Sequence, residues 1–414
     1  MTKQKSAKKF CIIFFLGIAS GLPLALILST LKALLLDKGF DLKTIGLFSL
    51  VALPYSLKIF FAPIIDSCSI PFLTRNLGHR RSWIIFNQLL LVFFISLLGV
   101  AGIAANLWAI TLFSFLVAFA SASQDIVIDG YRIELLEQED QGLAASFYVY
   151  GYRIGMLISG AGALALADIL SWDAVYFIMA GCMASTVFVT ILADETRKNF
   201  KTKSHSFLSW IKNSVIDPFI DLTRHKQWVA IIAFVICFKL ADAFAGNLTL
   251  PFLLEIGFSK IEIASIVKTF GLFATLFGVF VGGVLVKKIN INNSLWIAAL
   301  AQMLSNLTFA YLATIGYNRE VLYGVIFIEN MSGGIGDAVF VAYLSALCNR
   351  SFSATQYAIL VSFATLSRSL LTSSAGIFAQ NLGWHDFFIF STLIAIPSLL
   401  FLMMLQKSQK LSGN

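Results

Sequence analysis

Two aspartates stand in the middle of a long apolar segment, where an ionised side chain is costly. The stretch from Phe119 to Leu136 reads FASASQDIVIDGYRIELL and carries Asp125 and Asp129, which are four residues apart. Residues at that spacing share one face of a helix. A charge at the centre of a bilayer costs at least about 2.5–3.5 kcal/mol, so the pair marks a functional site that faces protein or water.

Each of the two aspartates has more than one candidate role. A buried carboxylate changes its affinity for protons when a cation or a substrate moves beside it, so we predict proton coupling at Asp125 and Asp129. The alternative for Asp125 is a permanent structural ion pair, with Arg153 as the candidate partner, that joins the fourth and fifth membrane spans. Asp129 lies three residues before Arg132, a spacing that favours a gate-forming ion pair.

Further polar side chains in apolar segments are candidates for substrate contact. Lys239 and Asp242 are three residues apart and share a helical face, in a stretch rich in small residues. Lys32 either extends toward the outer membrane surface or offers a cation to an anionic ligand. Tyrosines and amides at membrane depth suit a hydroxyl-rich ligand. The predicted substrate-binding residues are Lys32, Tyr55, Gln124, Tyr152, Lys239, Asp242 and Asn330.

The composition of the chain is typical of a membrane protein. Hydrophobic residues make up 58% of the 414 residues, charged residues only 13%, and the mean hydropathy is +0.84. These values indicate an all-α, multi-pass membrane protein. The net charge of +8 lies mostly in short loops, where membrane topology explains it better than nucleic-acid binding. The five cysteines form no CxxC spacing, which indicates neither a disulfide framework nor a metal site.

We predict twelve membrane spans, since each crossing needs about 20 apolar residues. Lys and Arg are concentrated in the loops on the side of the N-terminus, which predicts that both termini are cytoplasmic. On the opposite side, only Lys38, Lys43, Lys260 and Arg319 lie in loops. The predicted spans cover residues 10–36, 44–65, 83–104, 107–131, 142–167, 174–193, 228–253, 262–286, 294–315, 321–347, 354–380 and 386–406.

Internal similarity divides the chain into two halves. The polar segment 194–227 separates residues 1–193 from residues 228–414 and reads as a cytoplasmic linker. GFDLKTIG at 39–46 aligns with GFSKIEIA at 257–264, and similar registers place Asp125 opposite Asp337 and Arg153 opposite Arg368. We assign Arg153, Asp337 and Arg368 to gating. Secondary transporters with parallel repeats are built in this way and bind substrate between their halves.

The loop after the second span carries a motif with a known counterpart. PIID at 63–66 and LGHRRSW at 77–83 resemble the G-x-x-x-D-R-x-G-R-R signature of the major facilitator superfamily. In that superfamily the motif is a cytoplasmic latch that stabilises the outward-facing state. The resemblance implies gating roles for Asp66, Gly78, Arg80 and Arg81. The inserted CSIPFLTRN stretch and His79 depart from the signature.

A second resemblance is more specific. ASGLPLALILSTLKA at 19–33, DLKTIGLFSLV at 41–51, SASQDIVID at 121–129 and GYRIGMLISGAGALALAD at 151–168 resemble the AmpG family of muropeptide permeases. The resemblance implies import of N-acetylglucosaminyl-1,6-anhydro-N-acetylmuramyl peptides by proton symport. It also implies the inner membrane of a Gram-negative bacterium, where peptidoglycan is recycled.

Two rival functions stay open beside muropeptide import. One is transport of a related anionic metabolite such as acetyl-CoA, and the other is a membrane sensor or scaffold that keeps the fold without transport. No nucleotide-binding G-x-x-x-x-G-K-[ST] stretch and no nucleophile with a base is recognisable, so we predict neither an enzyme nor a cofactor. The expected partners are muropeptide, protons and membrane lipid, and we expect a monomer.

Overall fold

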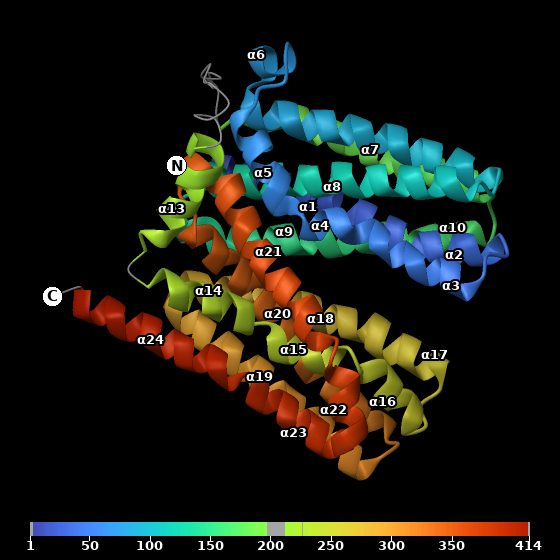
Figure 1. The fold of residues 1–414 in the computed structure, drawn as a ribbon, viewed down its shortest axis with the longest axis vertical. Coiled ribbons are helices and arrows are strands. Elements are labelled where there is room, and N and C mark those ends of the chain that lie inside the picture. The colour runs from blue at the N-terminus through green and yellow to red at the C-terminus, as the bar shows by residue number, and fades with distance from the viewer. Residues whose placement is uncertain (1–2, 197–211, 226, 413–414) are drawn as a thin grey trace. The chain divides into compact units, whose positions relative to one another are not determined.

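Helices joined by turns and short loops form the described part of the chain. The structure is a computed structural model that describes residues 3–196, 212–225 and 227–412. Figure 1 labels most of the α-helices and colours the chain from blue at the N-terminus to red at the C-terminus. As predicted, the protein is all-α.

Up to residue 192 the helices are α1 (Lys3–Ala25), η1 (Leu26–Thr30), α2 (Leu31–Asp37), α3 (Leu42–Leu47), η2 (Phe48–Ala52), α4 (Leu53–Ser56), α5 (Lys58–Ser67), α6 (Leu73–Leu77), α7 (His79–Ile103), α8 (Leu107–Leu135), η3 (Gln138–Asp140), α9 (Gln141–Leu157), η4 (Ile158–Gly162), α10 (Ala163–Ala167) and α11 (Trp172–Leu192). After residue 211 they are η5 (Lys212–Ile216), α13 (Asp217–Thr223), α14 (Trp228–Cys237), α15 (Leu240–Gly246), α16 (Thr249–Glu255), α17 (Lys260–Ile263), η6 (Ala264–Phe270), α18 (Gly271–Ile289), α19 (Ile291–Ile315), α20 (Arg319–Leu347), η7 (Arg350–Phe352), α21 (Ser353–Thr372), α22 (Ala375–Leu382), α23 (Trp384–Ile394) and α24 (Ile396–Ser412).

The chain forms two compact units. Unit 1 comprises residues 1–137, 147–219 and 348–359, and unit 2 comprises residues 138–146, 220–347 and 360–414. Within the predicted linker 194–227, residues 197–211 and 226 lie outside the described residues, and the remainder contains η5 and α13. The predicted division into halves 1–193 and 228–414 stays a prediction.

The described residues include eleven helices that are long and apolar enough to cross a membrane. A twelfth span exists if Leu50–Ser56 and Lys58–Ser67 are counted together, although the two pieces are bent by 52° at Leu57. Pro54 is the second residue of α4 and Pro63 lies inside α5, and neither can donate a backbone hydrogen bond. The prediction of twelve spans agrees with this count when the bent pair is one span.

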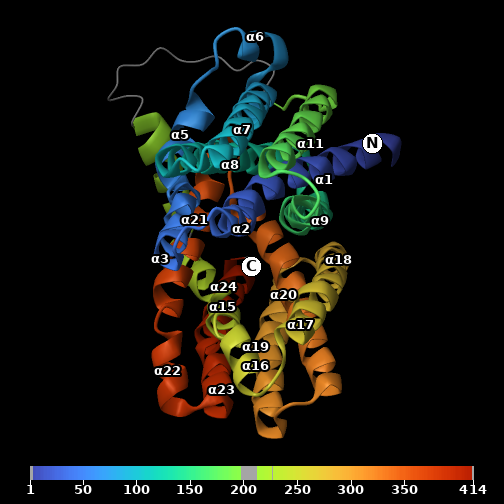
Figure 2. The same cartoon turned by 90° about the vertical axis from the view of Figure 1, so that its right-hand side faces the viewer.

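Small residues allow the central helices of unit 1 to touch. A Cβ atom added to Gly17 or Gly21 on α1 would collide with backbone of Tyr148 or Tyr152 on α9. Figure 2 shows α9 beside α1, and Figure 1 shows α7 running along α8. Because helix association in a membrane depends on close packing, these glycines fix the place of α1 against α9.

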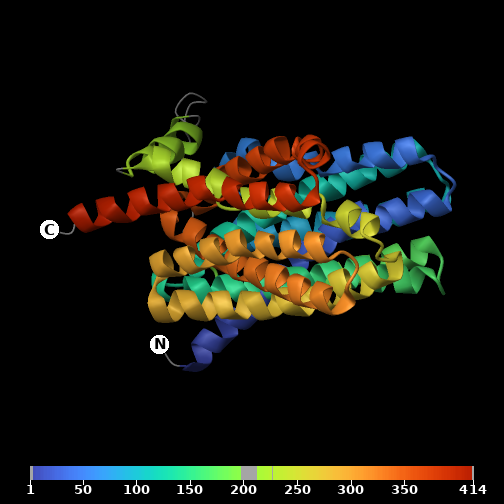
Figure 3. The ribbon, with the colours of Figure 1, turned by 90° about the horizontal axis from the view of Figure 1, so that it is seen from below.

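Glycines also allow close helix packing in unit 2, between α18 and α20. A Cβ atom at Gly278 on α18 would collide with the carbonyl of Met331 on α20, and one at Gly334 on α20 would collide with the carbonyl of Thr275 on α18. Figure 3 shows α18, α19 and α20 as neighbouring long helices in yellow and orange. This packing holds the polar residues in the middle of α20 against α18.

Candidate functional site

The second and fourth spans meet at a buried ion pair. Lys58 is the first residue of α5, directly after the bend, and its ammonium lies 2.7 Å from Oδ2 of Asp125 on α8. Both side chains are buried. The predicted pair with Arg153 is therefore wrong: Asp125 joins the second and fourth spans, because the bend brings Lys58 to the face of α8 that carries the aspartate.

Other predicted polar residues surround this ion pair. The Lys58 ammonium lies 5.4 Å from the centre of the Tyr55 ring, within range of a cation–π contact. The side-chain nitrogen of Gln124 donates to the carbonyl of Ala19 at 2.9 Å. Oε1 of Gln124 and Oδ1 of Asp125 are buried and have no hydrogen-bond partner in the described part of the chain. The rings of Tyr152 and Tyr148 are tilted relative to each other, with centroids 6.2 Å apart.

Asp129 lies one turn further along α8 and has a cation of its own. Nη2 of Arg132 is 3.5 Å from Oδ1 of Asp129, so the predicted ion pair is present. The Arg132 guanidinium is fully buried and lies 5.5 Å and 5.4 Å from the ring centres of Tyr148 and Tyr357. This arrangement holds a buried charge between two rings. The gating role of the pair stays a prediction.

Unit 2 contains a second cluster of charged groups. Lys239 is the N-cap of α15, at a break between α14 and α15. Its ammonium lies 2.8 Å from Oδ1 of Asp337, 3.5 Å from Oδ2 of Asp242 and 3.2 Å from the carbonyl oxygen of Gly333. The structure thus brings together residues for which we predicted different roles, namely substrate binding for Lys239 and Asp242 and gating for Asp337.

The remaining predicted residues have varied surroundings. Asn330 is occupied by protein groups: its amide nitrogen donates to Oε2 of Glu329 at 2.8 Å, and its Oδ1 accepts from Thr275 Oγ1 at 3.0 Å. Lys32 is exposed on α2 and has no ion-pair partner among the described residues. Arg153 is half-buried, and Arg368 is exposed but close enough to Lys239 to repel it.

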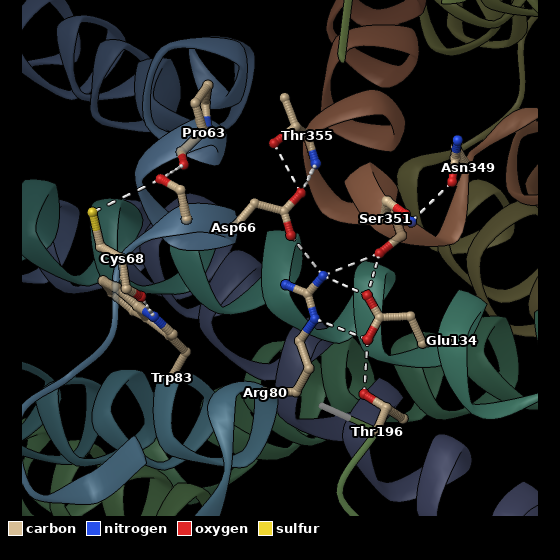
Figure 4. A network of polar contacts seen from close by, with 12 residues as sticks. Pro63, Asp66, Cys68, Arg80, Trp83, Glu134, Thr196, Asn349, Ser351 and Thr355 are labelled. Atoms are coloured by element: carbon tan, nitrogen blue, oxygen red, sulfur yellow. Dashed lines mark hydrogen bonds and ion pairs between the residues drawn. The ribbon is translucent and has the colours of Figure 1, made fainter. Parts of the chain in front are cut away.

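The loop after the second span forms the network drawn in Figure 4. The fully buried Arg80 places Nη2 2.7 Å from Oδ1 of Asp66 and 2.7 Å from Oε1 of Glu134. Oδ2 of Asp66 accepts hydrogen bonds from the backbone nitrogen and the hydroxyl of Thr355, both at 2.9 Å. Because Thr355 lies in the first turn of α21, Asp66 also faces the positive end of a helix dipole.

Gly78 and Arg81 connect this network to the end of the sixth span. Glu195 accepts hydrogen bonds from the backbone nitrogens of Arg80 and Arg81, at 3.1 Å and 2.9 Å, and so caps α7. Gly78 has φ +86° and ψ 177°, and a Cβ atom there would collide with the Glu195 side chain. The Arg81 guanidinium donates to the carbonyls of Thr190 and Ile191.

Sequence reasoning missed five residues of these clusters. Lys58 gave a signal, because a lysine inside an apolar run needs a partner. The others are separated from the motif by 54 to 289 positions along the chain, and nothing in the sequence links them to it. They are Glu134, Glu195, Ser353 and Thr355, of which Ser353 accepts a hydrogen bond from Arg80 at 3.0 Å and donates one to Glu134 at 2.6 Å.

Known proteins resemble this chain in sequence and in fold. Residues 13–372 match the Major Facilitator Superfamily. The "Putative transporter AmpG 4" of Rickettsia felis is 40% identical over 398 residues, which cover 95% of this chain and 96% of the relative. The chain belongs to the AmpG family of the major facilitator superfamily. The "Anhydromuropeptide permease" of Escherichia coli (strain K12) is 37% identical over 400 residues, which cover 96% of this chain and 79% of the relative.

Solved structures of other transporters share the fold of this chain. The major facilitator transporter FucP in its outward conformation has a TM-score of 0.71 at 15% identity, over 96% of this chain and 97% of FucP. The proton:xylose symporter XylE has a TM-score of 0.67 at 12% identity, over 97% and 95% of the two chains. The predicted fold is confirmed, as is the prediction of a transporter rather than an enzyme.

Proposed function

We propose that this protein imports anhydromuropeptides, N-acetylglucosaminyl-1,6-anhydro-N-acetylmuramyl peptides, from the periplasm to the cytoplasm by proton symport. It acts as a monomer in the bacterial inner membrane with both termini in the cytoplasm, and its two halves alternate access to the substrate. The name of the 37% identical relative from Escherichia coli supports the substrate. The excess of basic residues in the loops on the side of the N-terminus supports the orientation.

The observation that carries this proposal is a pair of buried hydrogen-bond acceptors beside the ion pair of Lys58 and Asp125. Oε1 of Gln124 and Oδ1 of Asp125 lack partners in the described part of the chain. A buried acceptor without a partner costs about 1–3 kcal/mol, a cost that a donor from a ligand removes. The sugar hydroxyls and amide N–H groups of a muropeptide are such donors. Tyr55 and Tyr152 add ring surface next to the same ion pair.

Lysines account for the anionic end of the ligand. Lys32 has an exposed side chain without an ion-pair partner among the described residues, so its ammonium is available to a peptide carboxylate. Lys58 becomes available only when Asp125 loses its negative charge, because the two groups now neutralise each other at 2.7 Å. Protonation of Asp125 therefore frees a cation for the substrate, which couples proton binding to substrate binding.

The test is uptake of radiolabelled anhydromuropeptide into proteoliposomes that contain the purified protein. We expect accumulation when the outside is acidic and none when the inside is acidic. Equal uptake under both gradients would contradict proton symport. Failure to take up the ligand under either gradient, by folded protein, would contradict the substrate and direct the same assay to acetyl-CoA. An absence of flux for all ligands would favour a sensor or scaffold.

The coupling role of Asp125 has its own test. We expect Asp125→Asn to abolish accumulation against a gradient and to preserve exchange of labelled for unlabelled muropeptide, because exchange needs no net proton movement. Asp168→Asn is the control, since Asp168 lies at the end of the fifth span, away from the charged clusters. Loss of protein yield together with loss of exchange would contradict coupling and indicate a structural ion pair.

A further inference from the structure

The acids at membrane depth differ in whether a cation neutralises them. Asp125 is paired with Lys58 and Asp129 with Arg132. Asp242 and Asp337 share the ammonium of Lys239. The remaining acid is Glu329 on α20, and no cation of the described residues lies within ion-pair distance of its carboxylate.

Glu329 lies well inside the membrane span and not at its end. It is ten residues from Arg319, the first residue of α20, which places it about 15 Å along the helix. Its side chain is mostly shielded from solvent. An isolated negative charge at this depth costs several kcal/mol, and a bound proton removes that cost.

The group that holds the Glu329 carboxylate is neutral. The amide nitrogen of Asn330 donates to Oε2 of Glu329 at 2.8 Å, and the amide oxygen of Asn330 accepts from Thr275 on α18 at 3.0 Å. An amide N–H bonds to a carboxylate and to the carbonyl oxygen of a carboxylic acid alike. Glu329 can therefore gain or lose a proton without breaking this hydrogen bond, whereas each paired aspartate would leave an uncompensated cation.

The charges that face Glu329 come from two elements, α15 with its N-cap and η6. Asp242 on α15 repels a second negative charge. Lys239, at the start of α15, attracts one, but its ammonium is held by Asp337 and Asp242. Lys268 on η6 also attracts one, although it forms no ion pair with Glu329. The proton on Glu329 thus responds to any rearrangement of the Lys239 cluster.

We propose that Glu329 is a proton-binding group of the transport cycle, in unit 2 of the protein. The inference rests on the proton symport proposed above and adds a second acid to Asp125. In the outward-open state the carboxylate takes one proton from periplasmic water and becomes a neutral carboxylic acid. In the inward-open state it releases that proton to cytoplasmic water, so that one proton crosses for each cycle of this group.

The experiment compares Glu329→Gln with the unaltered protein in proteoliposomes, by uptake under an acidic outside and by exchange at equal pH. Glutamine keeps the size and the amide partner of Glu329 but cannot ionise. We expect loss of the stimulation by outside acid, with exchange preserved. The matched control is Glu320→Gln, nine residues earlier on α20 and exposed, which we expect to behave like the unaltered protein.

Two results would overturn the inference. One is gradient-driven accumulation by Glu329→Gln at the level of the unaltered protein, and the other is loss of exchange together with net uptake in folded Glu329→Gln. An infrared pH titration of purified protein gives an independent answer. A carboxylic-acid C=O band should appear in the unaltered protein and be missing in Glu329→Gln, which assigns that band to Glu329. The same bands in both proteins would also overturn the inference. If the unaltered protein shows no stimulation by acid, the proposed symport itself fails.

Discussion

Arg80 is the most informative position for testing how the network of Asp66, Arg80 and Glu134 stabilises unit 1. Its guanidinium is fully buried and lies against the carboxylates of Asp66 and Glu134, each at 2.7 Å. Replacement by Met keeps much of the volume and removes the charge. Both carboxylates then lose the cation that lies against them while they stay buried.

The size of the effect follows from these contacts. Removal of one partner from a buried ion pair costs about 3–5 kcal/mol, because the remaining charge is left uncompensated. Arg80 compensates two carboxylates, which points to the upper end of that range. Hydroxyl and backbone donors of Thr355, Thr196 and Ser353 remain on the two acids and prevent a doubled cost. We therefore expect Arg80→Met to lower the free energy of unfolding by about 5 kcal/mol.

The assay is reversible unfolding of the purified protein in mixed micelles with increasing SDS. Arg75→Met is the matched control, because Arg75 lies in the same loop with an exposed side chain, and we expect a change within about 0.5 kcal/mol. Combining Arg80→Met with Asp66→Asn and Glu134→Gln removes the uncompensated charges, so this triple variant should recover part of the lost stability. A loss below about 1 kcal/mol for Arg80→Met, or no recovery in the triple variant, would refute the reasoning.

Two further substitutions test neighbouring features. Gly78→Ala forces a side chain into a backbone conformation that glycine alone adopts readily, and it displaces Glu195 from the start of α7. Unfolding experiments should therefore show a loss of stability of at least about 1–3 kcal/mol. An unchanged stability would contradict the capping role of Glu195. Lys58→Met leaves Asp125 buried without its cation and should lower the free energy of unfolding by about 3–5 kcal/mol. The double variant Lys58→Met with Asp125→Asn should lose less stability than Lys58→Met alone. Additive losses would show that the ion pair is unimportant for stability.

The membrane spans could be predicted from the sequence because their signal is local. A run of about 20 apolar residues is visible without knowledge of the fold. The predicted span 83–104 corresponds to α7 at His79–Ile103, and 294–315 corresponds to α19 at Ile291–Ile315. The bend in the second span was not predicted, although Pro54 and Pro63 on either side of Leu57 carried a signal for it.

The acids of the candidate site were predictable, but their partners were not. A carboxylate in an apolar segment is conspicuous, so Asp125, Asp129, Asp242 and Asp337 could be found from the sequence alone. Asp129 was correctly paired with Arg132 because the two lie within one turn. The partner of Asp125 lies 67 positions away on another helix, and only the packing of α5 against α8 selects Lys58 over Arg153.

Asp125 and Asp337 are the two aspartates that the predicted internal repeat aligns. Each binds a lysine, at 2.7 Å and 2.8 Å. Lys58 comes from the second span, however, and Lys239 from the seventh, whose predicted repeat counterpart is the first. The two lysines nevertheless share a structural position, since Lys58 follows the bend at Leu57 and Lys239 stands at the break before α15. A helix is free to reorient at a break. In each unit, therefore, the lysine that binds the aspartate lies at a bend or break in a helix, so a change of charge at the aspartate acts at that break.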